Sequence, residues 1–102
     1  MSQPRALTPD EIRDRLLATL RVIASEWARY PDKTPLERCE GAIFSTLVAL
    51  DGRSCGLPGF DLIPTPHESD KDYLIANGEN WIEPGTRISD TLHEHFYRRE
   101  ST

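Results

Sequence analysis

One four-residue pattern, T-P-x-E, occurs three times in this chain and limits what the chain can fold into. The threonine before a helix accepts hydrogen bonds from free backbone N–H groups, and a proline in the first turn gives up no useful donor. A glutamate three residues after the threonine completes a capping box. The repeated pattern therefore predicts three helix starts, at Thr8, Thr34 and Thr65.

Apolar residues follow the first two starts at a spacing of three or four, which predicts helices over residues 8–30 and 35–50. Pro31 disfavours helical geometry before it, and Gly52 offers the left-handed position that ends the second helix. The alternative for residues 42–52 is a β-hairpin, because the segment is rich in β-formers and ends in Asp-Gly. Helical spacing and the preceding cap favour the helix. The two helices are expected to pack as an antiparallel hairpin.

The second half of the chain is less regular. Glycines and prolines interrupt it after Gly52, and they leave room for two short strands that could pair as a ribbon. The sequence therefore predicts an α+β fold, predominantly helical, in a single domain of residues 1–102. Its expected elements are helices at about 8–30, 35–50, 65–77 and 89–99, with strands at about 60–63 and 81–83.

Charge and composition exclude several classes of function. The net charge of −5 argues against direct binding to a nucleic-acid backbone, and six carboxylates face only Lys71 within residues 61–83. Such an acidic strip is typical of a solvated surface, and it also attracts a metal ion or a basic partner. No apolar run approaches the roughly 20 residues that a membrane helix needs. Residues 1–7 lack the apolar segment of a secretory signal.

The cysteines and the known catalytic motifs give no sign of chemistry. Cys39 and Cys55 are too few and too unpatterned for a disulfide framework or a zinc site, so a cytoplasmic protein is expected. Neither a phosphate-binding glycine pattern nor a nucleophile with its base is present. We therefore expect no cofactor, no membrane association and, on balance, no enzyme.

Two segments carry residues that suit a binding site. Residues 65–73, TPHESDKDY, are explained as the start of a helix, although His67 and Asp70 would share one helix face. Residues 77–81, NGENW, place an acid, an amide and a large aromatic in a loop, where binding sites are frequent. The predicted binding residues are His67, Asp70, Tyr73, Glu79, Asn80, Trp81 and His93.

The His-x-His pair at residues 93 and 95 suggests a metal site only on a strand. On the predicted helix the two rings diverge by about 160°, which excludes a joint chelate. The apolar stripe of that helix places His95 toward the core and His93 away from it.

Four segments, ERCEGAIFSTLVALDG, HESDKDY, NGENW and LHEHFY, resemble a family of short, uncharacterised bacterial and phage-borne proteins. The resemblance covers about residues 36–97. It implies a prokaryotic or phage origin and no particular activity, and it favours an accessory or interaction role.

Two hypotheses of function remain. The first is a small, acidic, cytoplasmic protein with an accessory or regulatory role, which binds a protein partner with a basic surface and whose oligomeric state is open. The alternative is a metal-binding module or a metal-assisted hydrolase. Its ligands would be His67, Asp70, Glu79 and His93.

Overall fold

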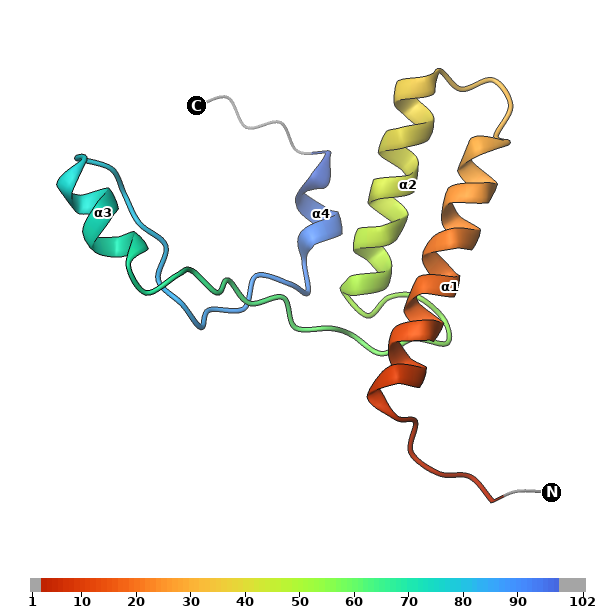
Figure 1. Cartoon of the computed structure of the whole chain (residues 1–102). Coiled ribbons are helices and arrows are strands. Elements are labelled where there is room, and N and C mark those ends of the chain that lie inside the picture. The colour runs from red at the N-terminus through yellow and green to blue at the C-terminus, as the bar shows by residue number, and fades with distance from the viewer. Residues whose placement is uncertain (1–2, 98–102) are drawn as a thin grey trace.

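The computed structural model describes residues 3–97 of the 102-residue chain. These residues form four α-helices and no strand: α1 (Pro9–Ala28), α2 (Pro35–Leu50), α3 (Asp70–Ala76) and α4 (Leu92–Phe96). Helix α2 packs against both α1 and α4, whereas α3 packs against no other helix (Figure 1). The predicted α+β class is therefore wrong, and the described fold is all-α.

The first two helix starts form as predicted. The Thr8 hydroxyl accepts the Glu11 N–H at 3.2 Å, and the Glu11 carboxylate accepts the Thr8 N–H at 2.9 Å. The corresponding distances between Thr34 and Glu37 are 3.1 and 2.8 Å. The Arg5 guanidinium and the capping bond together lower the pKa of Glu11 to about 2. Both boxes satisfy backbone donors that would otherwise lack partners.

A close approach of two helices joins α1 and α2 into the expected hairpin. Gly41 of α2 is buried, and a Cβ placed on it would lie 2.5 Å from ring carbons of Trp27. The Trp27 indole donates a hydrogen bond to the Ser45 hydroxyl at 3.0 Å, and its ring stacks on Tyr30 with centroids 5.0 Å apart. Glycine at position 41 thus makes room for the largest side chain of α1.

Helix α2 ends as the Asp-Gly pair predicts, and the alternative β-hairpin is wrong. Gly52 has a φ of +82°, and its N–H donates to the Ala49 carbonyl at 3.2 Å. The next N–H, that of Arg53, reaches back to the Val48 carbonyl at 3.0 Å. This pair of bonds is the Schellman motif, which satisfies carbonyls at a helix end.

The third T-P-x-E pattern does not start a helix, because side chains further along take the free N–H groups. The His67 N–H donates to the Asp70 carboxylate at 3.1 Å, and the Ser69 N–H donates to Nδ1 of His67 at 3.2 Å. Such local bonds compete with helical ones. Helix α3 therefore begins at Asp70 rather than Thr65, and it is only seven residues long.

The two predicted strands are absent from the described residues. The segment at 60–63 lies beside residues 88–89 rather than 81–83. The Leu62 carbonyl accepts the Ile88 N–H at 2.9 Å, but the Leu62 N–H donates to the Ser89 hydroxyl at 3.1 Å. The Ser89 hydroxyl thus accepts the Leu62 N–H that a β-ladder would need as a donor. The single backbone hydrogen bond that remains does not make a sheet.

Helix α4 is shorter than the predicted helix over 89–99, whose last residues, 98 and 99, lie outside the described part. Asp90 has a positive φ of 97°, and the helix begins only at Leu92. His93 is half-buried and His95 is exposed, so the predicted orientation of these two rings is wrong.

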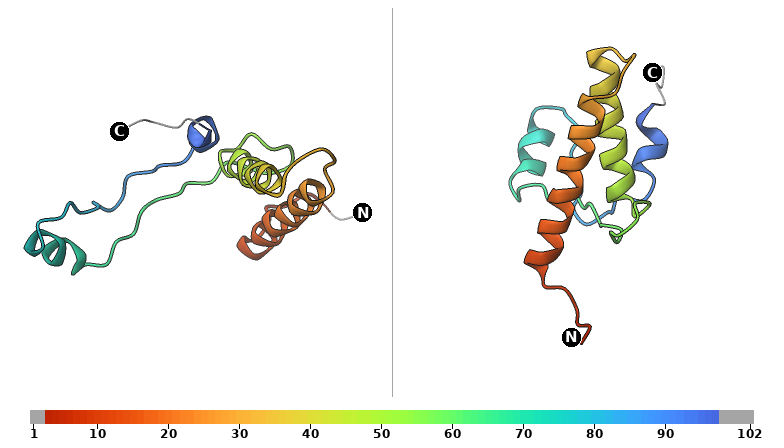
Figure 2. Two further views of the ribbon diagram at one scale, coloured as in Figure 1. Left: turned by 90° about the horizontal axis from the view of Figure 1, so that it is seen from above. Right: turned by 90° about the vertical axis from the view of Figure 1, so that its right-hand side faces the viewer.

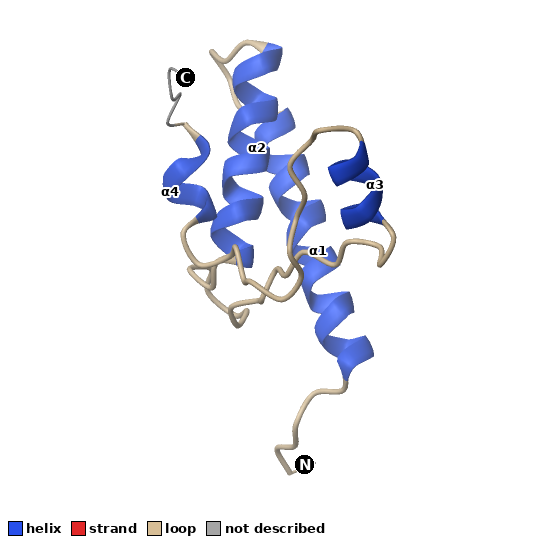
Figure 3. Ribbon diagram, turned by 90° about the vertical axis from the view of Figure 1, so that its left-hand side faces the viewer, coloured by secondary structure: helices blue, strands red, loops and turns tan. Residues whose placement is uncertain are grey.

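The described chain is extended rather than compact. Its radius of gyration is 18.0 Å, against about 13 Å for a compact domain of this length. Among residues 3–97, only Ala49 and Leu57 are buried apolar side chains, and no large side chain is fully buried. Two long loops join the segment around α3 to the part of the chain that contains α1, α2 and α4 (Figures 2 and 3).

Candidate functional site

Residues 61–88 form an arm that reaches away from the other three helices (Figure 2). An outgoing segment leads to α3, and a return segment runs back to α4. The base of the arm is held together by the Asp61–Arg87 ion pair at 3.2 Å and by the bonds from Leu62 to Ile88 and Ser89. The base thus joins the two ends of the arm, while its tip projects freely.

Polar and aromatic contacts hold the tip of the arm together. The Lys71 ammonium lies 3.2 Å from the Glu83 carboxylate and 5.1 Å from the centroid of the Trp81 ring. The Trp81 indole donates to Glu83 at 2.7 Å, and this bond, with that of Lys71, lowers the pKa of Glu83. A cavity of about 250 Å³ lies between the start of α3 and the return segment. Its lining residues are Pro66, His67, Glu68, Lys71, Ile82, Glu83 and Pro84.

Six of the seven predicted binding residues lie on this arm, and all six are exposed: His67, Asp70, Tyr73, Glu79, Asn80 and Trp81. His67 and Asp70 are joined at the start of α3, as described above. Tyr73 is 68% exposed and Trp81 is 40% exposed, so neither aromatic ring fills a core. The arm therefore presents its aromatic side chains to the outside.

The seventh predicted residue, His93, lies on α4 and is engaged elsewhere. Its Nδ1 lies 2.6 Å from the Asp51 carboxylate, and its backbone N–H donates to the same group at 2.8 Å. Residues 3–97 contain no group of three or more His, Cys, Asp or Glu side chains arranged to hold a metal ion. The structure thus does not bring His93 together with His67, Asp70 and Glu79.

Asp51 is a central residue that the sequence patterns did not single out. Its side chain is completely buried at the end of α2, where it also accepts the Asp90 N–H at 2.7 Å. Burial acts to raise the pKa of Asp51, but the hydrogen bonds from His93 and Asp90 outweigh it and lower the pKa. One carboxylate thus fastens the start of α4 to the end of α2. The only signal in the sequence is an Asp-Gly helix end, which looks like an ordinary turn.

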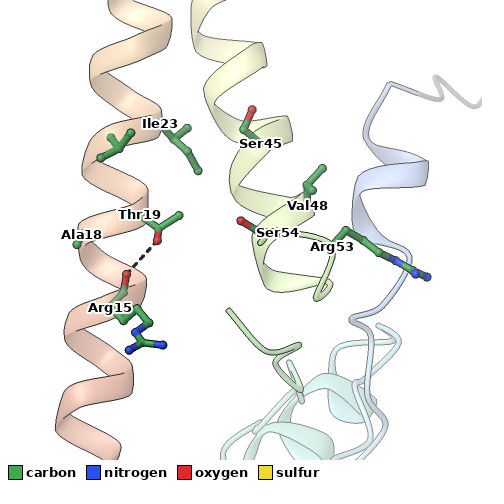
Figure 4. A pocket seen from close by; sticks show the side chains of 9 residues that line it. Arg15, Ala18, Thr19, Ile23, Ser45, Val48, Arg53 and Ser54 are labelled. Carbon is green, nitrogen blue, oxygen red and sulfur yellow. Dashed lines mark hydrogen bonds between the residues drawn. The ribbon is translucent and has the colours of Figure 1, made fainter. Parts of the chain in front are cut away.

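A groove between α1 and α2 is the second feature that the sequence did not reveal (Figure 4). It has a volume of about 540 Å³. Apolar side chains from both helices line it, and Arg15 and Arg53 are the charged residues in its wall. Its lining residues are Arg15, Ala18, Thr19, Val22, Ile23, Ser45, Val48, Arg53 and Ser54. Periodicity marked the lining positions on α1 and α2 as helical, but it gave no measure of how much space the two helices leave between them.

Large apolar side chains remain uncovered over much of the described surface. Fourteen are exposed, and seven of them lie on the arm: Leu62, Ile63, Tyr73, Ile75, Trp81, Ile82 and Ile88. Large exposed apolar patches mark interaction sites in monomeric proteins. The arm and the groove are therefore the two candidate binding surfaces of the described chain.

Comparison with family models, curated proteins and solved structures gives no match to this chain. In the described part of the chain, none of the helices combines the length and the apolar character needed to cross a membrane. Cys39 and Cys55 are both exposed free thiols.

Proposed function

We propose that this chain is a small protein-binding protein, and that it presents the arm to its partner. One observation carries the proposal: the arm exposes seven large apolar side chains, whereas residues 3–97 bury only Ala49 and Leu57 as apolar core. A partner that covers this surface is bound more tightly, because each Å² of apolar area removed from water stabilises the complex by about 25 cal/mol. Binding through this surface needs no catalytic group.

The length of α3 supports the same proposal. Seven residues are fewer than the roughly 12 that an isolated helix needs to be even marginally stable in water. Helices of this size depend on packing, yet α3 contacts no other described helix. A partner that packs against an exposed apolar side chain of α3, such as Tyr73, supplies the missing contacts. The arm then resembles the short helices that proteins insert into apolar grooves.

The charge of the arm defines the chemistry of the partner. Residues 61–88 carry six carboxylates against Lys71 and Arg87, a net charge of −4. A surface that combines an apolar groove with basic side chains is complementary to it. We propose an accessory or regulatory role in the cytoplasm for such binding. The bacterial or phage origin that the sequence resemblance suggests stays a prediction.

Affinity capture with the full-length chain as bait tests the proposal. The wild type is compared with Ile75→Asp/Ile82→Asp, which places two carboxylates on exposed positions of the arm. An untagged copy of the chain is added to the native lysate, so that self-association is scored with other partners. We expect at least one protein to be retained by the wild type and lost with the arm variant.

The matched control is Leu36→Asp/Ile43→Asp, which adds the same two charges at exposed positions of α2. It is expected to retain whatever the wild type retains. If the arm variant recovers every protein as well as the control does, including the untagged chain, the arm is not the binding surface and the proposal fails.

A further inference from the structure

We propose that the partner of the arm is a second copy of this chain, and that the arm of each copy lies in the α1–α2 groove of the other. This inference rests on the proposed function of the arm and names its partner. The result is a two-fold dimer in which each chain gives one arm and receives one.

The groove and the arm match in polarity and in charge. The groove is lined by apolar side chains that include Val22, which is 55% exposed. Arg15 and Arg53 are its charged lining residues, and the Arg53 side chain extends from the end of the groove toward α4 (Figure 4). No carboxylate is among its described lining residues. The arm offers apolar side chains beside a net charge of −4. One chain thus holds both halves of a complementary pair.

The arm does not reach the groove of its own chain in this structure. Helix α3 contacts neither α1 nor α2, and the bonds at the base of the arm direct it away from both helices (Figures 1 and 2). The two complementary surfaces of one chain therefore stay apart. A second copy satisfies both surfaces at once, because a two-fold axis that seats one arm also seats the other.

Symmetry also strengthens the contact. Once the first arm is seated, binding of the second is intramolecular, so that two individually weak contacts give a stable pair. Burial between chains then takes the place of the large apolar core that is missing within residues 3–97. In this dimer the arm of one chain and the groove of the other cover each other, which explains why both are exposed in a single chain.

Two charge-reversal variants of the full-length chain test the inference by sedimentation equilibrium. The groove variant is Arg15→Glu/Arg53→Glu. The arm variant is Glu68→Arg/Asp72→Arg/Glu79→Arg, which changes the net charge of the arm from −4 to +2; all five positions are exposed. The wild type is expected to have twice the 11.6 kDa mass of one chain. In each variant alone, arm and groove carry like charges, so we expect the dimer dissociation constant to rise roughly tenfold or more.

Mixing the two variants gives the decisive measurement. In the mixed pair, an acidic arm faces a basic groove at one contact, and a basic arm faces an acidic groove at the other. We therefore expect a one-to-one heterodimer of wild-type affinity from two chains that each self-associate more weakly than the wild type. This restoration also shows that neither variant failed to fold.

Three results overturn the inference: a wild type that stays monomeric, a dimer that both variants retain, or a mixture that does not associate. Each of these leaves the proposed function to its own test, since arm-dependent capture of a different protein is scored separately with Ile75→Asp/Ile82→Asp. If the wild type neither self-associates nor captures any partner through the arm, both proposals are contradicted together.

Discussion

The α1–α2 hairpin and the arm both contain the T-P-x-E pattern ahead of a helix, yet they form very different structures. In the hairpin, two capped helices pack along their length, and Gly41 receives the Trp27 ring. In the arm, the same pattern precedes a seven-residue helix that packs against no other helix. A capping box contributes a local bond or two, whereas a long helix also needs an apolar face with something to cover it.

The largest loss of stability is expected from Asp51, which joins the end of the hairpin to α4, just after the arm returns. Replacing Asp51 with alanine removes a buried acceptor of three hydrogen bonds and leaves the donors of Asp90 and His93 without a partner. We expect a loss of about 3 kcal/mol in the free energy of unfolding. Urea denaturation followed by circular dichroism measures it. A loss below about 1 kcal/mol would mean that α4 is not fastened through this carboxylate.

A somewhat smaller effect is expected inside the hairpin. Gly41→Ala puts a methyl group 2.5 Å from the Trp27 ring, so the two helices must separate. Overpacking of this kind costs about 2 kcal/mol. Trp27→Phe removes Cε3 and Cζ3 of the indole, two of the three ring carbons that clash, so Gly41→Ala should cost less in that background. Equal costs in both backgrounds, measured by the same denaturation, would contradict the close approach.

Acid should weaken the same junction between α2 and α4 in the wild type. The pKa of Asp51 is lowered in the folded state, so its contribution to stability is present above the ordinary aspartate pKa of about 4 and is lost as the pH falls below it. Protonation leaves some hydrogen bonds in place, and the loss is therefore smaller than for Asp51→Ala. The measurement is thermal unfolding from pH 6 downward. Asp51→Asn, which cannot titrate, should show a shallower acid dependence.

The two uses of the T-P-x-E pattern can be separated by a pair of equivalent substitutions. Thr34→Ala removes a hydroxyl that accepts the Glu37 N–H, and we expect a loss of about 1 kcal/mol. Thr65→Ala removes a hydroxyl that caps no helix, since α3 begins at Asp70, and should change the stability little. Denaturation midpoints of the two variants give the comparison. Equal losses would show that Thr65 stabilises the fold as much as a true cap does.

The contrast between hairpin and arm also shows how far the sequence can be interpreted. Helices α1 and α2 were predictable because their caps, their periodicity and their ends all agree. The start of α3 was not, because His67, Ser69 and Asp70 form local bonds that compete with the helix. The prediction of strands was wrong for a related reason: the Leu62 N–H donates to the hydroxyl of Ser89, which lies 27 residues further along the chain.

The candidate site was predicted in part. Six of the seven proposed residues lie together on the arm, because they are close in sequence. His93 was misplaced, since its orientation depends on the buried Asp51, which is 42 residues distant in the chain. The groove was not foreseen, because the space between two helices depends on how closely they pack. Side chains that are close in sequence were thus placed on the same segment, whereas the long-range contact of Asp51 with His93 was not foreseen.

The smallest effect is expected at the tip of the arm. Lys71→Ala removes the ammonium that lies beside both Trp81 and Glu83, and these contacts are exposed. We expect faster hydrogen exchange of the amides of residues 70–83, with no change in the global denaturation midpoint, because exposed ion pairs contribute little to stability. The matched control is Lys33→Ala, which removes a similar cation 5.7 Å from the Tyr30 ring in the hairpin and should leave the arm unchanged. If Lys71→Ala instead lowers the global midpoint, measured at the same protein concentration, the arm unfolds together with the hairpin. The two regions would then be a single cooperative unit, and the arm would not be the separate, weakly held element that the contrast with the hairpin describes.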